Sequence, residues 1–246
     1  MAAHLGLQRQ VFVQPSVYGV DNSCMLDAMA LQGSNCRGVA VIDDSTTDGA
    51  LEEMNERGIR GVRVNALSVG LGDDAIIASR MENVALRTSR FGWHIQLFAA
   101  LPVIERLAVV LDRFPLPVVI DHMGMCRAEL GVGQAGISTL CDLLRGGNCW
   151  VKLSALYRVS SRPDCADTAP LISALIEAGP DRVVWASDWP HTGEHKADAD
   201  GHGHTSIVPF RRVDDAALQD VVVDCVKDEN ALRKLFVENP RALYGF

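Results

Sequence analysis

Short apolar runs rich in β-branched residues recur along the chain, and each has the length of a β-strand. Longer segments with apolar residues at helical spacing separate them, and Gly58, Gly92, Pro117 and Gly179 fall where a helix would give way to a strand. This alternation predicts a parallel sheet with right-handed crossovers. The expected strands are 10–16, 38–43, 61–65, 94–99, 118–124, 150–154 and 183–188, and the expected helices include 51–57, 74–90, 103–114, 136–145, 169–178 and 229–238.

The two-residue period of a strand sorts its polar side chains onto one face. In the fourth run His94, Gln96 and Phe98 share one face, and the apolar residues between them share the face expected to meet helices. Polar groups at the ends of several strands are what an active site at the C-terminal end of a barrel requires. By the same alternation His122 falls with Val118 and Ile120, Asp188 with Val184 and Ala186, Arg63 with Gly61 and Asn65, and Ser16 with Gln14.

Two strand ends carry side chains suited to hydrolysis. The apolar run VVWAS ends at Asp188, directly before Trp-Pro-His, and the run VVID leads into His122. A carboxylate can take a proton from water, and an imidazole can polarise a carbonyl or hold a metal. The alternatives are that Asp188 is a cap or turn residue before Pro190 and that His122 is a hydrogen-bonded structural histidine.

Two arginines near strand ends indicate an anionic ligand. Arg63 lies in GIRGVRVN and Arg158 in VKLSALYRVS, and a half-buried guanidinium favours a carboxylate or phosphate partner. The alternative for each is an internal salt bridge. Together with Ser16, Tyr18 and Tyr157 they favour a small anionic molecule, and the absence of a glycine-rich phosphate loop from the sequence disfavours a nucleotide.

Four further residues have less decided roles. His191 follows Trp-Pro and could contact the substrate or cap the turn. Lys152 lies within a strand, where pairing with an acid in the barrel floor is the favoured interpretation. His202 and His204 have a spacing found among metal ligands, but the surrounding polar, glycine-containing segment 194–206 is more typical of a loop.

Composition restricts the class of protein. With 246 residues and 48% hydrophobic content, residues 1–246 are expected to form a single domain. A net charge of −8 without a Lys/Arg cluster disfavours nucleic acid or a membrane surface as a partner. The seven cysteines contain no CxxC motif, which disfavours a disulfide framework and a zinc-thiolate site, and neither a signal peptide nor a membrane span is recognisable. We therefore expect a cytoplasmic protein.

Several segments together resemble a known family. GIRGVRVN, GWHIQLF, VVIDHMG, VKLSALYRVS and VVWASDWPH, followed by the closing NPRALYGF, are similar in this order to the amidohydrolase superfamily. Within it they are most similar to the metal-independent lactonase branch, whose members include 2-pyrone-4,6-dicarboxylate lactonases. The resemblance implies an α/β fold, a distorted (β/α)8 TIM-like barrel, with the site at the C-terminal ends of the strands and hydrolysis of a carboxylated lactone without a cofactor.

The resemblance also implies residue roles. Asp188 would be the general base that activates water, and His122 would stabilise the developing oxyanion. Arg63 and Arg158 would hold the substrate carboxylates, with Ser16 as a further contact.

Residues around this set are expected to line the same site. Tyr157 and His191 are further candidates for substrate contact, and Phe98 stands where the resemblance leads us to expect a substrate-contacting tyrosine. This departure predicts a difference in substrate specificity.

A larger departure concerns the first strand of the family, which bears an HxH motif. No such motif precedes Gln10, and His4 lies in what resembles the end of a helix. The chain is therefore expected to supply strands two to eight of the barrel, with a gap between the first and last strands. Such a gap would expose two strand edges, which favours association into a homo-oligomer, and would remove oxyanion donors typically worth about 10²–10³ in rate each.

Two other functions remain open at this point. One is a metal-dependent hydrolase or decarboxylase of the same superfamily, with a divalent ion such as Zn or Mn on His122, Asp188 and groups outside this chain. The other is a non-catalytic product that keeps an arginine-lined cleft for carboxylates.

Overall fold

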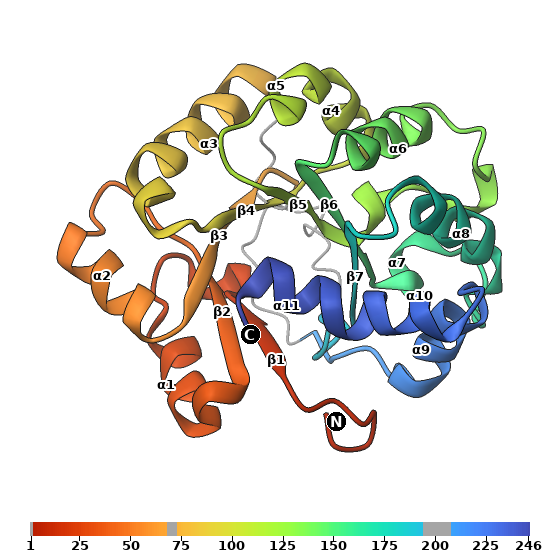
Figure 1. Cartoon of the computed structure of the whole chain (residues 1–246), viewed down its shortest axis with the longest axis horizontal. Helices are drawn as coiled ribbons and strands as arrows, with labels where there is room; N and C mark the ends of the chain where they lie inside the picture. The colour runs from red at the N-terminus through yellow and green to blue at the C-terminus, as the bar shows by residue number, and fades with distance from the viewer. Residues whose placement is uncertain (1, 68–72, 194–207) are drawn as a thin grey trace.

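The computed structural model describes residues 2–67, 73–193 and 208–246. Its described residues form one sheet of seven parallel strands whose spatial order equals their order in the chain. Figure 1 shows this sheet curled about a central space, with helices around its outside. All seven predicted strands are confirmed, several with shorter ends: β1 Gln10–Val13, β2 Cys36–Ala40, β3 Ile59–Asn65, β4 His94–Phe98, β5 Val118–Ile120, β6 Cys149–Ser154 and β7 Val183–Ala186.

The helices that link the strands are largely those expected. The predicted helix at 103–114 consists of two, and the one expected at 229–238 is an α-helix and a π-turn that lead into a third segment. Four helices in the described residues were not predicted: α1, whose apolar residues are not confined to one face, the four-residue α7, and α9 and α11. The bounds are α1 Ser23–Gln32, α2 Asp48–Glu56, α3 Asp74–Thr88, α4 Leu101–Arg106, α5 Ala108–Asp112, α6 Ile137–Gly146, α7 Leu156–Val159, α8 Ala169–Ala178, α9 Asp215–Asp224, α10 Glu229–Arg233 and α11 Asn239–Tyr244, with the π-turn at Lys234–Glu238.

The two faces of the sheet bury different kinds of side chain. On β4, Ile95 and Leu97 are fully buried in the large core beneath the helices. The other face of the sheet carries a small apolar cluster of Val119, Trp150 and Val184, together with the buried polar residues of β4 and β6. The alternation predicted for β4 is therefore confirmed, and the polar face lies inside the curve of the sheet.

Close packing inside the curve explains one glycine of β3. A Cβ atom added at Gly61 would lie 2.4 Å from Nε2 of His94 on the neighbouring strand. Any larger residue would displace the histidine, which is 2% exposed. Gly61 thus allows a bulky ring to fill the interior at this level.

β1 and β7 are the two edges of the described sheet. Among the described residues before β1, residues 2–6 form turns, so the expectation that His4 ends a helix is wrong. The turn ends at Gly6, which adopts a left-handed conformation (φ 68°) that does not continue a helix. Two expectations stay predictions: that these residues lack a counterpart of the family's first strand, and that the protein associates through the edges of its sheet.

The C-terminal segment returns to the start of the sheet. In Figure 1, α10 and α11 run across the front of the molecule beside β7 and bring the C-terminus close to β1 and β2. The ring of Phe246 lies under the guanidinium carbons of Arg9 and Arg37, at 5.3 and 4.9 Å, and Arg37 donates a hydrogen bond to the Gly245 carbonyl.

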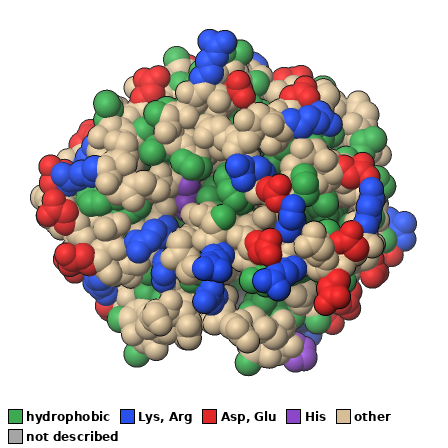
Figure 2. Space-filling model, viewed as in Figure 1, with side chains coloured by type: hydrophobic (Ala, Val, Ile, Leu, Met, Phe, Trp, Pro, Cys, Tyr) green, Lys and Arg blue, Asp and Glu red, His purple; other side chains and the backbone are tan. Residues whose placement is uncertain are grey.

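Figure 2 shows basic side chains near the middle of this same face and acidic ones mostly toward its sides. None of the helices in the described ranges has both the length and the apolar character that crossing a membrane requires.

The layered packing predicts unequal effects of two leucine truncations. Leu97 is fully buried on β4, whereas Leu31 on α1 is 89% exposed. Leu97→Ala should lower the free energy of unfolding by about 2–5 kcal/mol because it leaves a cavity in the core, and Leu31→Ala by less than about 0.5 kcal/mol. Denaturant unfolding followed by circular dichroism measures both. Equal effects of the two substitutions would contradict the assignment of this strand face.

Candidate active site

His122 reaches the site through a turn rather than through strand alternation. β5 ends at Ile120, and His122 and Met123 adopt left-handed conformations, with φ of 50° and 52°. Val118 and Ile120 pack in the outer core, so the prediction that His122 shares their face is wrong. The left-handed turn breaks the two-residue period and places the imidazole against polar groups from β6 and the end of β7.

Asp188 lies just beyond β7, also in a left-handed conformation (φ 64°), and its two carboxylate oxygens have different surroundings. Oδ2 accepts hydrogen bonds from the hydroxyl of Tyr157, at 2.6 Å, and from Nε of Arg158, at 3.0 Å. Oδ1 lies 3.6 Å from Nε2 of His122. Tyr157 and Arg158 therefore hold one oxygen, and the other faces the imidazole. The Asp188 side chain is 21% exposed, so it is within reach of solvent.

The surroundings of Asp188 favour its ionised form. Burial raises the pKa of this carboxyl. The nearby His122 ring, the hydrogen bond from Tyr157 and the Arg158 guanidinium lower the pKa by more than burial raises it, so the pKa lies below the ordinary value of 3.8. Burial and the adjacent Asp188 raise the pKa of Tyr157, which keeps its phenol protonated as a donor. Asp188 is therefore an anion at neutral pH.

The imidazole of His122 is buried between polar and aromatic partners. Its Nδ1 lies 2.8 Å from Oγ of Ser154, the last residue of β6, and the ring of Phe98 meets it edge-on at a centroid distance of 5.3 Å. Burial lowers the pKa of His122, an effect that the charges of Asp121 and Asp188 oppose only in part. The ring is consequently neutral around pH 7.

Arg63 on β3 extends the site toward the loop after β1. Its Nη1 donates to Oγ of Ser16 at 3.1 Å and to the carbonyl of Gln14 at 3.3 Å, and Asn65 also donates to Ser16, at 2.8 Å. The guanidinium carbon lies 5.3 Å from the centre of the Phe98 ring. The structure thus brings together Arg63, Ser16 and Phe98, and their contact with substrate stays a prediction.

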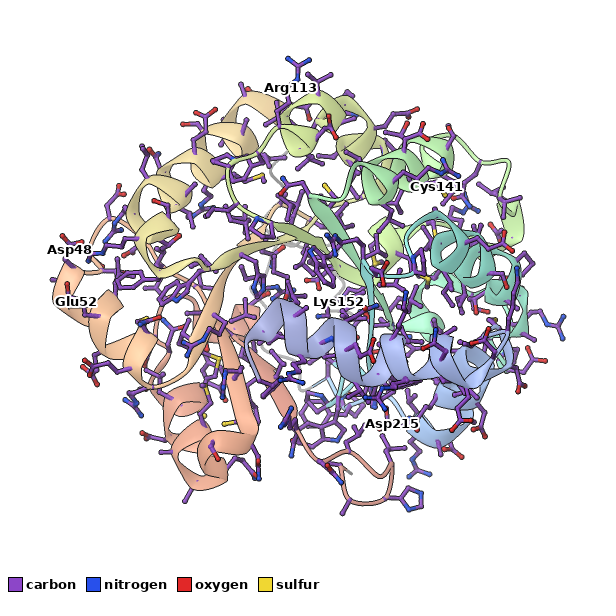
Figure 3. The ribbon with its side chains drawn as sticks, viewed as in Figure 1. Asp48, Glu52, Arg113, Cys141, Lys152 and Asp215 are labelled. Atoms are coloured by element: carbon purple, nitrogen blue, oxygen red, sulfur yellow. The ribbon has the colours of Figure 1, made fainter. Side chains whose placement is uncertain are left out.

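A second buried carboxylate, Asp121, supports this arrangement from the interior. It accepts hydrogen bonds from Lys152 Nζ at 2.9 Å and from Gln96 Nε2 at 2.9 and 3.0 Å, and Arg63 Nε lies 3.6 Å away. Burial raises the pKa of Asp121, but Lys152, His122 and Arg63 together lower it well below its ordinary value. The predicted pairing of Lys152 with an interior acid is confirmed, and Figure 3 shows Lys152 near the centre of the molecule.

Arg158 and His191 make internal contacts beside Asp188. Arg158 bonds Asp188 through Nε and the Thr192 carbonyl and hydroxyl through Nη2. His191 Nε2 lies 3.2 Å from the Asp215 carboxylate, and its ring packs edge-on against Tyr157 at 5.5 Å. The contacts of Arg158 match the internal salt bridge weighed for it. The His191 side chain contacts Asp215 of α9 and the Tyr157 ring rather than its own turn, and its contact with substrate stays a prediction.

Three contributors to this network were not named as site residues from the sequence. Asp121 precedes the predicted His122, and Gln96 and Ser154 lie on the inward faces of β4 and β6. The alternation pattern could have indicated Gln96 and Ser154. The pairing of Asp121 with Lys152 could not have been read from one strand, because it joins two.

The described residues do not fit a resident metal ion. His122 and Asp188 are the two potential ligands that converge, one carboxylate oxygen is engaged by Tyr157 and Arg158, and His122 Nδ1 faces Ser154. Catalytic zinc sites have three protein ligands, and the described ranges contain no cluster of three or more His, Cys, Asp or Glu side chains placed to hold an ion. His202 and His204 lie outside the described residues.

Comparison with known proteins points to one family. The family model described as "Amidohydrolase" matches residues 1–246. A 4-sulfomuconolactone hydrolase of Hydrogenophaga intermedia is 32% identical over 242 residues, covering 98% of this chain and 76% of the relative. A 2-pyrone-4,6-dicarboxylate hydrolase of Comamonas testosteroni is 30% identical over 251 residues, covering 98% and 77%.

A solved structure shares both the fold and part of the sequence. It is that of a Pseudomonas putida protein whose assignment as a 2-pyrone-4,6-dicarboxylic acid hydrolase is itself provisional. The TM-score is 0.81 at 28% identity, over 99% of this chain and 85% of the other. With the family model matched along the whole sequence and relatives of 30% identity or more aligned over 98% of it, the chain belongs to the amidohydrolase family.

Proposed function

We propose that the protein hydrolyses the ring ester of a small lactone that carries carboxylate or similar anionic groups. The observation that carries the proposal is the arrangement at Asp188, where Tyr157 and Arg158 hold Oδ2 and leave Oδ1 beside the neutral His122. A carboxylate with one unengaged oxygen next to a neutral hydrogen-bond donor is suited to general-base attack by water on a carbonyl.

The reaction uses these residues in a definite order. Water gives a proton to Asp188 Oδ1 as its oxygen bonds to the lactone carbonyl carbon, and the resulting oxyanion accepts a hydrogen bond from His122. The tetrahedral intermediate then collapses, the ring C–O bond breaks, and the leaving oxygen takes the proton from Asp188. The product is the ring-opened acid, and Asp188 is ionised again.

The charges around the site support an anionic substrate. Arg63, Lys152 and Arg158 are cationic, whereas Asp121 and Asp188 are anionic, so these five side chains carry an excess of positive charge on a chain whose net charge is −8. The two curated relatives are named for lactones that carry a sulfonate or carboxylates. We propose that Arg63 and Ser16 bind such a group and that Phe98 packs against the lactone ring.

Arg158, Tyr157 and His191 complete the proposed site. Arg158 and Tyr157 orient Asp188 and line the substrate's path to it, while His191 supports the Tyr157 ring. We also propose that the seven strands belong to a (β/α)8-type barrel and that hydrolysis needs no metal, because the described donor set offers two ligands rather than three.

A panel of carboxylated and sulfonated lactones tests this function. The purified protein should open at least one of them, with 2-pyrone-4,6-dicarboxylate as the first probe, and the rate should survive treatment with a chelator. Activity that is lost with the chelator and restored by Zn or Mn would establish the metal-dependent alternative. Ligand binding without turnover of any lactone would favour the non-catalytic alternative.

Asp188→Asn should reduce kcat by about 10²–10⁴, because the amide cannot take a proton from water. Steady-state kinetics with the best lactone of the panel measures the loss. Asp48→Asn is the matched control, since Asp48 lies on α2, is 74% exposed in its side chain and is labelled at the edge of the molecule in Figure 3. An Asp188→Asn variant as active as the Asp48→Asn control would contradict the proposed role of Asp188 as general base.

Arg63→Met should raise KM by about tenfold or more, because a charge-assisted hydrogen bond to the substrate anion is lost. The change in kcat should be much smaller. Arg90→Met, at an exposed arginine that pairs with Asp48 and Glu52, provides the control for loss of a positive charge. An unchanged KM for Arg63→Met would show that Arg63 does not bind the substrate.

The pH dependence follows from the lowered pKa of Asp188. A depressed carboxyl pKa keeps the base ionised as pH falls, so the acid limb of kcat/KM should lie below the ordinary carboxyl value of 3.8, provided that the fold survives. Tyr157→Phe removes a hydrogen bond that favours the anion and should move this limb to higher pH. Circular dichroism at each pH separates titration from unfolding. An acid limb that stays in place or moves down in Tyr157→Phe would contradict the account.

A further inference from the structure

The hydroxyl of Ser154 is placed to decide which nitrogen of His122 carries the proton. Ser154 ends β6 and is 1% exposed, and its Oγ lies 2.8 Å from Nδ1 of His122. A neutral imidazole has its proton on either Nδ1 or Nε2, and the hydrogen bond made by one nitrogen sets the state of the other. The hydroxyl can either donate to Nδ1 or accept from it.

The Asp188 side of the ring favours one of these two states. Nε2 lies 3.6 Å from Oδ1 of Asp188, which is an anion because Tyr157 and Arg158 hold its other oxygen. With the proton on Nδ1, a nitrogen lone pair would face this negative oxygen, and the two would repel. With the proton on Nε2, an N–H group faces the carboxylate, and the interaction is attractive.

The Ser154 side of the ring favours the same state. When Nε2 carries the proton, Nδ1 is an acceptor, and the buried hydroxyl donates its hydrogen to it. If Ser154 accepted from Nδ1 instead, its own hydrogen would need another acceptor, and Nδ1 of His122 is the partner that the described residues provide. A buried donor without an acceptor costs free energy, so both ends of the ring select the Nε2–H tautomer.

We propose that Ser154 is a positioning residue that holds His122 as its Nε2–H tautomer, so that the ring presents a donor to the reacting oxygen of the substrate. Ser154 acts through His122 and is not placed against the substrate. Its catalytic consequence rests on the proposed hydrolysis, whereas the tautomer is a property of the free protein. The two claims can therefore fail separately.

Two-bond ¹H–¹⁵N correlation spectra of the ¹⁵N-labelled full chain, recorded without substrate near neutral pH, read the tautomer directly. The His122 signals are assigned by their loss in His122→Asn. Wild type should show the pattern of an Nε2–H imidazole, and Ser154→Ala should shift His122 toward a mixture that includes Nδ1–H. A wild-type Nδ1–H pattern, or a tautomer unchanged in Ser154→Ala, overturns the proposal.

Kinetics on 2-pyrone-4,6-dicarboxylate, or on the best lactone of the panel, test the consequence. Ser154→Ala should lower kcat by about tenfold, as expected for loss of one hydrogen bond to a catalytic group, and should leave KM nearly unchanged. A rise in KM without a fall in kcat would contradict the positioning role. If no lactone is opened by wild type while the tautomer still depends on Ser154, the proposed function fails and the tautomer assignment stands.

Thr88→Val serves as the matched control for removal of a buried hydroxyl. Thr88 is 1% exposed and donates to the Val84 carbonyl on α3. The variant should lose stability comparably to Ser154→Ala but keep the wild-type His122 tautomer and kcat. If Thr88→Val changed the tautomer as strongly as Ser154→Ala, the effect would be a general loss of packing and the proposal would be wrong.

Discussion

The unequal surroundings of the two Asp188 oxygens determine what the rest of the site can do. Tyr157 and Arg158 both bind Oδ2 and fix the carboxylate, and the nearby His122 ring together with these two contacts lowers its pKa in spite of burial. Oδ1 is then directed at His122, at a distance of 3.6 Å. Loss of the Tyr157 and Arg158 contacts would raise the pKa of this carboxyl, and a protonated acid cannot act as a base.

A second buried acid, Asp121, lies beside Arg63 on the side of the site proposed to bind substrate. Asp121 is 1% exposed and is neutralised by Lys152, with Gln96 and Arg63 beside it. Removing one partner of such a group leaves an uncompensated buried charge, which is strongly destabilising. The interior of the curved sheet therefore holds a connected polar network rather than isolated catalytic residues, and the large apolar core is confined to the outer face beneath the helices.

Much of the fold follows from local sequence patterns. The seven strands were predictable because each parallel strand is a short β-branched run, and the inward face of β4 followed from the two-residue period. The same period failed at His122, because three successive residues, His122, Met123 and Gly124, adopt left-handed conformations, and glycine is the residue of DHMG that most readily indicates such a turn. Helix α1 was missed because its apolar residues do not form a single stripe.

The candidate site shows the same division. Asp188, His122, Arg63 and Ser16 could be singled out because each lies at or near the C-terminal end of a strand and has a side chain suited to hydrolysis or anion binding, and their roles stay proposals. Apart from the pairing of Lys152 with an interior acid, the internal pairings could not be predicted, since Tyr157 and Arg158 on α7 meet Asp188 beyond β7 only in the folded chain. Arg158 illustrates the point: its sequence position fits substrate binding, yet its guanidinium bonds Asp188 and Thr192 in the structure.

A single turnover in H₂¹⁸O tests most directly whether Asp188 acts as a base toward water. With enzyme in excess over the lactone, we predict that the first product carries one ¹⁸O in its new carboxylate. The peptide that contains Asp188 should carry none. An unlabelled first product together with ¹⁸O in the Asp188 carboxylate would show that Asp188 attacks the carbonyl itself, which would contradict the account.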